Sequence, residues 1–433
     1  MTSPSMSIDR RTYLALVSGA GVFAAGSFDT DIGRFGVEQT ALMTLDTVYQ
    51  ISPNYYVGPK TERPPASEAK GTIWEVTDPD NSRPTERTLS DGNRWLSISV
   101  TDGIREPGEF YLTPDDGFEA MQTIIDQHAP NVLIRLAPGT YEGSDLVLEN
   151  GVSIVGSGPN ATILKLAPGA NTDLLTTPTP ASRNVMSCCV RDITFEGNSD
   201  TNDTGTLVYG AFWNSRFQNC FFRNSPENGL WLAGSEASTD DNYVNQCQFI
   251  NNRGDGIRGG SNREAHPAVG VVRVDTNWFG HNDGPAIRAR GNAWRITNAK
   301  LYHNAKQRGT SIQIDRSKFT AVSGCDSYVS HPDRAHIAIR AHSGVDCASI
   351  QIKDNDFRGE FKAGVRCVAD GNDLRAIQIR GNTMYTDAGT PRGVLAEGDG
   401  AYQSCAFTDN ILSKEFGSQM LDLPDGWMIR DNL

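Results

Sequence analysis

Two short segments of the sequence place a carboxylate a few residues before an arginine. RGDGIR contains Asp255 and Arg258, and NDGPAIR contains Asp283 and Arg288. A guanidinium group binds carboxylates and sulfates through parallel hydrogen bonds, so both arginines are candidate contacts for an acidic glycan. If the two aspartates lay roughly 5–6 Å apart, they would match the catalytic carboxyl groups of retaining glycosidases. Asp255 and Asp283 are therefore candidate catalytic residues.

Similar segments add further candidate glycan-binding residues, namely Trp231, Arg340 and Arg366. A tryptophan ring offers a flat face on which a sugar can stack. Under the other interpretation, each aspartate before a glycine is a turn residue, and each arginine is its solvated ion-pair partner. The sequence leaves both interpretations open.

The remaining titratable residues predict no metal site. The sequence contains no C-x-x-C or H-x-x-x-H pair of the kind that binds zinc, and we predict neither a metal nor a cofactor. The pair Asp240-Asp241 is expected in a turn. The histidines are scattered and are expected at the surface, although His336 and His342 flank Arg340 and an imidazole there could act as a base.

A repeat of about 27 residues positions these segments. In each copy an apolar residue is followed three positions later by a small or amide residue and five positions later by a large apolar residue. A second short strand, such as the one that contains Trp231, follows. The copies begin at Val190, Phe217, Val244, Val274, Ile296, Val322, Ile352, Ile379, Phe407 and Ile429. Because two short strands cannot bury their apolar side alone, the coils are expected to stack.

Stacked coils of this kind predict an all-β fold, a right-handed parallel β-helix of about 10–12 coils over residues 113–433. Helical spacing over residues 116–127, then LAPGTY and VSIVGSG, resembles the entry to the pectate-lyase-like β-helix superfamily. That resemblance implies a capping helix over the first coil. Equivalent outward positions of the second strand would then form a stripe of Trp231, Arg258, Arg288, Gln313, Arg340 and Arg366.

Two further segments precede the repeat. Residues 65–112, with GTIWEVTD and LSDGNRWLSI, read as two strands and resemble the small β modules of phage tail fibres and tailspikes. Residues 1–64 are expected to form an N-terminal arm. Its Arg10-Arg11 pair and the apolar run after it resemble a twin-arginine export signal, and a retained virion anchor is the alternative.

The composition limits the partners. The net charge is −13, which argues against nucleic acid as a partner because phosphate binding needs a basic surface. Arginine outnumbers lysine 30 to 9, and this acidic, arginine-rich composition suggests a halophilic archaeal source. Cys220, Cys247 and Cys325 occupy one position of the repeat. They are predicted to be small core residues with free thiols rather than disulfide partners.

These observations predict a surface-displayed adhesin that binds a cell-surface polysaccharide or glycoprotein glycan. It would most resemble the tailspike or receptor-binding protein of a haloarchaeal virus, located outside the cell or on the virion. Its N-terminal region would contact tail or capsid proteins. A C-terminal coil without a cap predicts a homotrimer. The alternatives are an exported polysaccharide lyase or glycoside hydrolase for an acidic glycan, and a non-catalytic exported surface protein.

Overall fold

The computed structural model describes most of the chain. The described residues are 49–52, 55–58, 63–68, 73–78, 81–90, 95–98, 108–178, 184–234, 239–260, 269–306, 309–342, 344–386, 391–413, 416 and 421–432. The chain divides into two units, Met1–Gln127 and His128–Leu433. Arg10-Arg11 lies outside the described residues, and so does His266. Among the helices that are described, none has the length and apolarity needed to cross a membrane.

The first unit contains a five-stranded sheet. Its strands, in sheet order, are β1 (Tyr49–Ser52), β2 (Tyr55–Gly58), β3 (Ile73–Asp78), β4 (Asn81–Ser90) and β5 (Trp95–Ile98). β2 and β3 are parallel, and the other neighbours are antiparallel. A 3-10 turn, η2 (Ala66–Glu68), lies between β2 and β3 in the chain, and strand β6 (Glu109–Leu112) follows β5 and is not part of this sheet. Residues 70–98 were expected to form two strands and form three, β3, β4 and β5. Two more strands, β1 and β2, lie before residue 65.

One α-helix, α2 (Gly117–His128), follows β6, at the position that the apolar spacing predicted. Ala120, Met121, Ile124 and Ile125 are buried, and their spacing of three and four residues places them on one side of the helix. Its role as the cap of the first coil stays a prediction.

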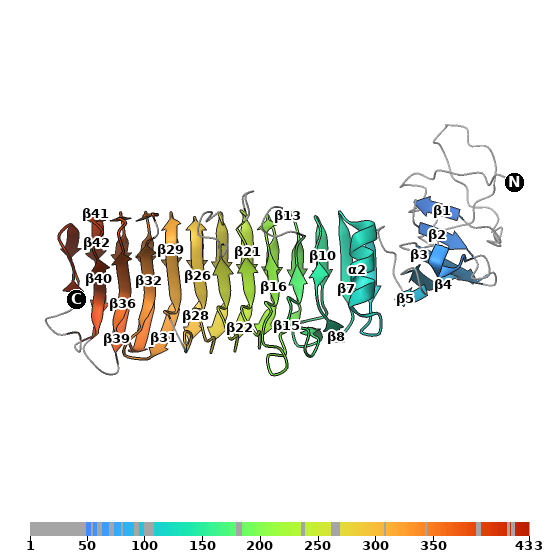
Figure 1. Ribbon diagram of the computed structural model, residues 1–433, viewed down its shortest axis with the longest axis horizontal. Helices are drawn as coiled ribbons and strands as arrows, with labels where there is room; N and C mark the ends of the chain where they lie inside the picture. The colour runs from blue at the N-terminus through green and yellow to red at the C-terminus, as the bar shows by residue number, and fades with distance from the viewer. Residues whose placement is uncertain are drawn as a thin grey trace, which may run out of the picture. The chain divides into compact units, whose positions relative to one another are not determined.

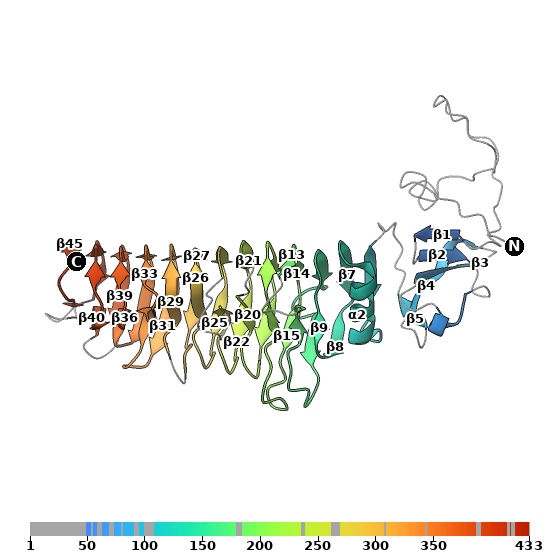
Figure 2. The same ribbon diagram turned by 45° about the horizontal axis from the view of Figure 1, so that its top comes forward.

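The second unit is a parallel β-helix, as predicted (Figure 1). Each coil contributes a strand to each of three long sheets, which run along the axis in both views (Figures 1 and 2). The first sheet contains β7 (Val132–Leu136), β10 (Val152–Val155), β14 (Cys189–Arg191), β18 (Arg216–Gln218), β21 (Asn242–Asn245), β24 (Val272–Asp275), β27 (Trp294–Thr297), β30 (Ala321–Ser323), β34 (Gln351–Lys353), β38 (Gln378–Arg380), β42 (Cys405–Thr408) and β45 (Trp427–Arg430).

The other two sheets follow in each coil. The second sheet contains β8 (Gly139–Gly143), β11 (Thr162–Leu166), β15 (Thr194–Glu196), β19 (Phe221–Arg223), β22 (Gln248–Ile250), β25 (Trp278–Gly280), β28 (Lys300–Tyr302), β31 (Asp326–Ser330), β35 (Asp356–Glu360), β39 (Thr383–Thr386) and β43 (Ile411–Leu412). The third contains β9 (Leu146–Val147), β12 (Leu175–Thr176), β16 (Val208–Gly210), β20 (Leu230–Leu232), β23 (Ile257–Gly259), β26 (Ile287–Asn292), β29 (Ile312–Lys318), β32 (Ala335–Ala341), β36 (Ala363–Ala369), β40 (Arg392–Gly398) and β44 (Leu421–Asp422).

Short strands flank the long sheets. β33 (Cys347–Ala348), β37 (Leu374–Arg375) and β41 (Tyr402–Gln403) form a side branch of the third sheet. β13 (Val185–Met186) pairs with β17 (Phe212–Trp213) beside the first sheet.

The repeat residues stack as the sequence predicted. Val190, Phe217 and Val244 are direct partners on the first sheet, and the register continues to Phe407 and Ile429. Side chains of successive coils meet in the core, where the rings of Phe222 and Phe249 stack at 4.6 Å. Such pairs add about 0.5–1.5 kcal/mol beyond the burial of their area.

The amide positions of the repeat form a hydrogen-bonded ladder in the turn after the first sheet. Asn382 Nδ2 donates to Asn410 Oδ1 at 2.9 Å, and Asn410 Nδ2 donates to Asn432 Oδ1 at 3.0 Å. Cys220, Cys247 and Cys325 fill the same position in other coils. All three are buried, and their thiols are free, which confirms the prediction for these described residues.

Candidate functional site

The predicted stripe lies on the outer side of the third sheet, with one change. Strand register pairs Trp231 with Arg258, Arg258 with Arg288, and Arg288 with Gln313. The next partners are Ala338 and then Arg366. Arg340 is not part of this ladder. It pairs with Asp315 and Val368, two residues further along the strands.

Trp231 and Arg258 contact each other. The Arg258 Cζ atom lies 4.5 Å from the Trp231 ring centroid, and Tyr209 packs on Trp231 at 4.9 Å. The indole nitrogen of Trp231 donates to the carbonyl of Gly260 at 2.7 Å. Burial lowers the pKa of Arg258. The guanidinium therefore covers the tryptophan face on which a sugar was expected to stack.

The carboxylate of Asp255 pairs with Arg288. Its carboxylate accepts hydrogen bonds from Arg288 Nε at 2.6 Å and from a terminal guanidinium nitrogen at 3.2 Å, and Asp255 is only 3% exposed. Burial opposes the charged form of Arg288, but the bond to Asp255 outweighs it, so the pKa of Arg288 is raised. Gly284 leaves the space for this carboxylate, since a Cβ there would lie 2.4 Å from Asp255 Oδ1.

Asp283 is placed by the turn before Gly284, where its backbone nitrogen donates to the carbonyl of Asn252 at 2.9 Å. The catalytic role of Asp255 and Asp283 stays a prediction. The internal pairing of Asp255 with Arg288 is what the alternative interpretation expected.

At the far end of the stripe, Arg366 pairs with Glu397. The nearest nitrogen and oxygen are 2.5 Å apart, and Lys362 lies 3.5 Å from the same carboxylate. Burial raises the pKa of Glu397, but Arg366 and Lys362 together lower it below its usual range. Two arginines of the stripe, Arg288 and Arg366, thus have carboxylate partners within the protein.

The expectation of surface histidines is wrong for His336. It is fully buried, its ring stacks on Phe357 at 4.8 Å, and its Nδ1 lies 2.8 Å from Ser327 Oγ. Burial lowers its pKa to about 3, so it is neutral at neutral pH. His336 is therefore a core residue.

A different site lies on the outer side of the first sheet. A hollow of about 370 Å³ opens there, lined by Ser187, Cys188, Cys189, Asn214, Ser215, Arg216, Asp241, Tyr243 and Arg273. Strand register makes Arg216, Tyr243 and Arg273 consecutive partners on β18, β21 and β24. The Arg216 Cζ atom lies 5.5 Å from the centre of the Tyr243 ring. We call this hollow the first-sheet groove.

The first-sheet groove has unneutralised positive charge. Arg216 and Arg273 are exposed, and among the described residues no carboxylate oxygen lies within 4.0 Å of either guanidinium. Asp241, the second aspartate of the predicted turn pair, is an exposed member of the lining. Beside it, Met186 and Trp213 pair on β13 and β17 and are 41% and 43% exposed. Cations, a phenol ring and nearby apolar side chains suit the carboxylate or sulfate and the ring of an acidic sugar.

The sequence analysis did not predict this groove, although the repeat pattern contains the residues that line it. The outward position of the first strand is the residue directly before each repeat start. Arg216, Tyr243 and Arg273 precede Phe217, Val244 and Val274. Side chains alternate between the two faces of a strand. This alternation predicted the stripe on the third sheet, and on the first sheet it places Arg216, Tyr243 and Arg273 on the outer face.

Comparison with known proteins identifies no family. No protein-family model matches the sequence, and no curated protein matches it. Solved structures of similar architecture include the Azotobacter vinelandii mannuronan C-5 epimerase AlgE6 A-module, with 14% identity and a TM-score of 0.46, covering 70% of this chain and 99% of that one. The tailspike of E. coli bacteriophage HK620 has 12% identity and a TM-score of 0.48, covering 71% of this chain and 64% of that one.

A third similar structure is ORF18 of Geobacillus virus E2, with 11% identity and a TM-score of 0.48, covering 81% of this chain and 74% of that one. At these identities the likeness concerns the fold alone. The chain is a parallel β-helix protein, and its own site residues must carry any statement about function.

Proposed function

We propose that this chain is a surface-displayed β-helix protein that binds an anionic polysaccharide in the first-sheet groove. The observation that supports this most strongly is the Arg216, Tyr243 and Arg273 ladder. It places two exposed guanidinium groups, one on each side of a phenol ring, on three neighbouring coils. Neighbouring coils are about 4.8 Å apart, so the two arginines are separated by roughly 10 Å.

The charge distribution favours direct contacts between an anionic ligand and the groove over long-range electrostatic attraction to the whole protein. The protein as a whole carries a net charge of −13, so it repels polyanions at long range. A polyanion that binds must therefore make direct hydrogen bonds to the groove. In molar salt the Debye length is about 3 Å, and such contacts would still hold while long-range attraction would not.

A protein of this kind fits the outside of a cell or the surface of a virus particle, where the glycan would serve as the attachment receptor. The homotrimer, the halophilic archaeal source and contact of the N-terminal region with tail or capsid proteins are further parts of the proposal. The enzyme alternative has one observation in its favour, because the exposed carboxylate of Asp241 lines the same groove. A lyase or hydrolase would release shortened glycan during the binding assay.

The test is binding to acidic polysaccharides by isothermal titration calorimetry, with polygalacturonate, alginate and a sulfated glycan as ligands and dextran as the neutral control. We expect the wild type to bind at least one acidic polymer and not dextran. Arg216→Ala/Arg273→Ala should weaken that binding at least tenfold, which corresponds to about 1.4 kcal/mol.

The matched control is Arg358→Ala/Arg375→Ala, which also removes two positive charges, one from β35 and one from β37. These side chains are 55% and 50% exposed, so their loss leaves no buried group unpaired. We expect less than a twofold change. Equal losses in the two double variants would mean that net charge alone is responsible, and this result would refute the proposed groove.

A further inference from the structure

A second hollow lies on the same side of the first sheet. Its volume is about 280 Å³, and its lining includes Arg295, Phe319, Gln351 and Lys353. The Phe319 ring is 58% exposed, so an apolar surface faces the solvent beside two cations. Arg295 donates to the carbonyl of Trp294 at 3.3 Å and to the carbonyl of Phe319, which holds its guanidinium against this turn. Its composition repeats that of the first-sheet groove, with cations, an aromatic ring and polar side chains.

The two hollows are joined by one ladder of side chains. Arg273, in the first-sheet groove, is the direct strand partner of Arg295 in the second hollow. Two residues further along the strands, Lys353 is the partner of Arg380. The cations of this face are therefore Arg216, Arg273, Arg295, Lys353 and Arg380. Among the described residues, none of the five has a carboxylate within 4.0 Å.

The row of cations is long. From β18, which contains Arg216, to β38, which contains Arg380, the sheet order gives six coil spacings. At about 4.8 Å per coil the row spans roughly 29 Å. The first-sheet groove alone, from β14 to β24, covers three spacings, or roughly 14 Å.

On this basis we infer that the ligand is a linear polyanion that lies along the β-helix axis and occupies both hollows. The inference rests on the proposed function and deepens it by naming the form of the glycan. A pyranose residue spans about one coil spacing, so the row accommodates about six acidic sugars of an internal segment of the chain.

A short terminal epitope would not explain this arrangement. It would occupy one hollow and leave the cations of the other unneutralised. Like charges at neighbouring coils repel, and the third sheet relieves that repulsion internally with Asp255 and Glu397. On the first sheet, Asp241 and Asp275 lie on the same face, but among the described residues none of the five cations has a carboxylate oxygen within 4.0 Å. A polymer with regularly spaced acidic groups supplies these missing partners.

The experiment measures affinity against chain length. Size-defined oligosaccharides, from dimer to octamer, are prepared from the acidic polymer that binds most tightly, and each Kd is measured by calorimetry. We expect the affinity of the wild type to rise up to about the hexamer and then level off. Arg295→Ala/Lys353→Ala should bind the trimer like the wild type but lose at least tenfold in affinity for the hexamer.

Arg216→Ala/Arg273→Ala should lose affinity for oligomers of every length, and the control Arg358→Ala/Arg375→Ala should follow the wild type throughout. All variants are compared by thermal melting, so that a folding defect is recognised. The inference is overturned if affinity does not change between trimer and hexamer, or if Arg295→Ala/Lys353→Ala matches the wild type on the hexamer. In both cases binding in the first-sheet groove would still stand. Failure of every acidic oligomer to bind would overturn the proposed function as well.

Discussion

Arg288→Ala is predicted to destabilise the fold strongly, although Arg288 was first a candidate ligand contact. Arg288 makes two hydrogen bonds to Asp255, at 2.6 and 3.2 Å, and Asp255 is 3% exposed. Removing the guanidinium leaves a buried carboxylate without its ion-pair partner. Breaking a buried ion pair from one side costs about 3–5 kcal/mol.

Arg366→Ala is the matched control because it breaks an ion pair on the same sheet. The Arg366 side chain is 40% exposed and that of Glu397 is 31% exposed, so water replaces the lost partner. An exposed pair contributes about 0–1 kcal/mol. The two substitutions remove the same atoms and the same charge. Arg288 pairs with buried carboxylates, Asp255 and, at 3.9 Å, Asp315, whereas Glu397 is partly exposed and keeps Lys362 at 3.5 Å.

The assay is urea denaturation followed by circular dichroism, with the midpoint and slope recorded for each variant. We expect a large decrease in the midpoint for Arg288→Ala, a small one for Arg366→Ala, and partial recovery in Asp255→Ala/Arg288→Ala, which removes the unpaired charge. The reasoning is refuted if Arg288→Ala unfolds at the same urea concentration as Arg366→Ala. That result would return Arg288 to the set of candidate ligand contacts.

Four other predictions concern the cysteines, His336 and the oligomeric state. Burial raises the pKa of Cys325 to about 12, so iodoacetamide should modify the partly exposed Cys189 in the native protein and leave Cys325 and Cys220 unmodified until unfolding. Cys220→Ala should cost about 1–2 kcal/mol through lost packing, and a reductant should leave the melting temperature unchanged, whereas a decrease would reveal a disulfide. The pKa of His336 falls from about 6.5 in the unfolded chain to about 3 in the folded one, so the unfolded state takes up the proton first. Stability should therefore be complete above pH 6.5 and decline as the pH falls towards 3, and His336→Gln should show a shallower decline in melting temperature over this range. Light scattering should give a mass near three times the 47.1 kDa of one chain, and a stable monomer would contradict the predicted trimer.

The periodic part of the fold could be predicted from the sequence because stacking repeats one local pattern. The spacing from Val190 to Phe217 to Val244 equals one coil, and these residues are direct partners on the first sheet. The free, buried state of Cys220 and Cys247 followed from the same spacing. Each of these features depends only on which residues face the axis, and the alternation of a strand specifies that.

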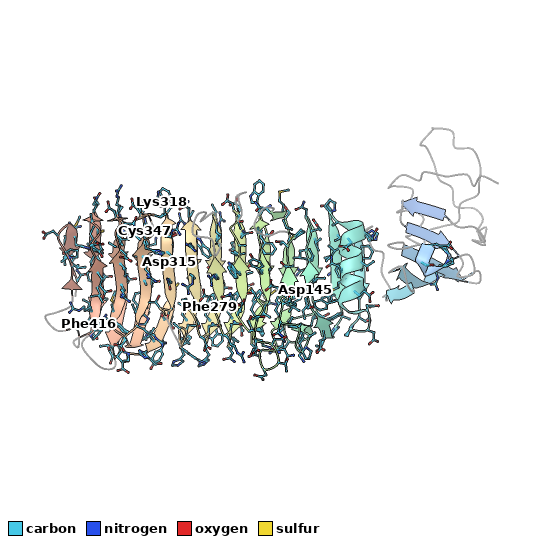
Figure 3. The ribbon with its side chains drawn as sticks, viewed as in Figure 1. Asp145, Phe279, Asp315, Lys318, Cys347 and Phe416 are labelled. Carbon is cyan, nitrogen blue, oxygen red and sulfur yellow. The ribbon has the colours of Figure 1, made fainter. Side chains whose placement is uncertain are left out.

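Two placements differ from the sequence prediction. The stripe position between Gln313 and Arg366 belongs to Ala338, a small apolar residue, and the charged Arg340 lies two residues later on the same side of the strand. Arg340 pairs instead with Asp315, which Figure 3 labels. His336 was misplaced because burial of a histidine depends on neighbours such as Phe357 and Ser327, which lie elsewhere in the chain.

The sequence also could not predict which carboxylate pairs with which arginine. Asp255 reaches Arg288 because Gly284, in the next coil, leaves room for its carboxylate. Glu397 reaches Arg366 across 31 residues, in a segment that the sequence analysis did not single out. The ion pairs decide which arginines are available to a ligand. The first-sheet groove, by contrast, could have been found from the residue before each repeat start.

The most direct test of the central claim is a crystal structure of the protein with an acidic hexasaccharide. We predict electron density for sugar over Arg216, Tyr243 and Arg273, continuing along the first sheet towards Arg295 and Lys353, with carboxylate or sulfate groups at the guanidinium groups. Sugar density over Trp231 and Arg258 on the third sheet, with the first-sheet groove empty, would contradict the account.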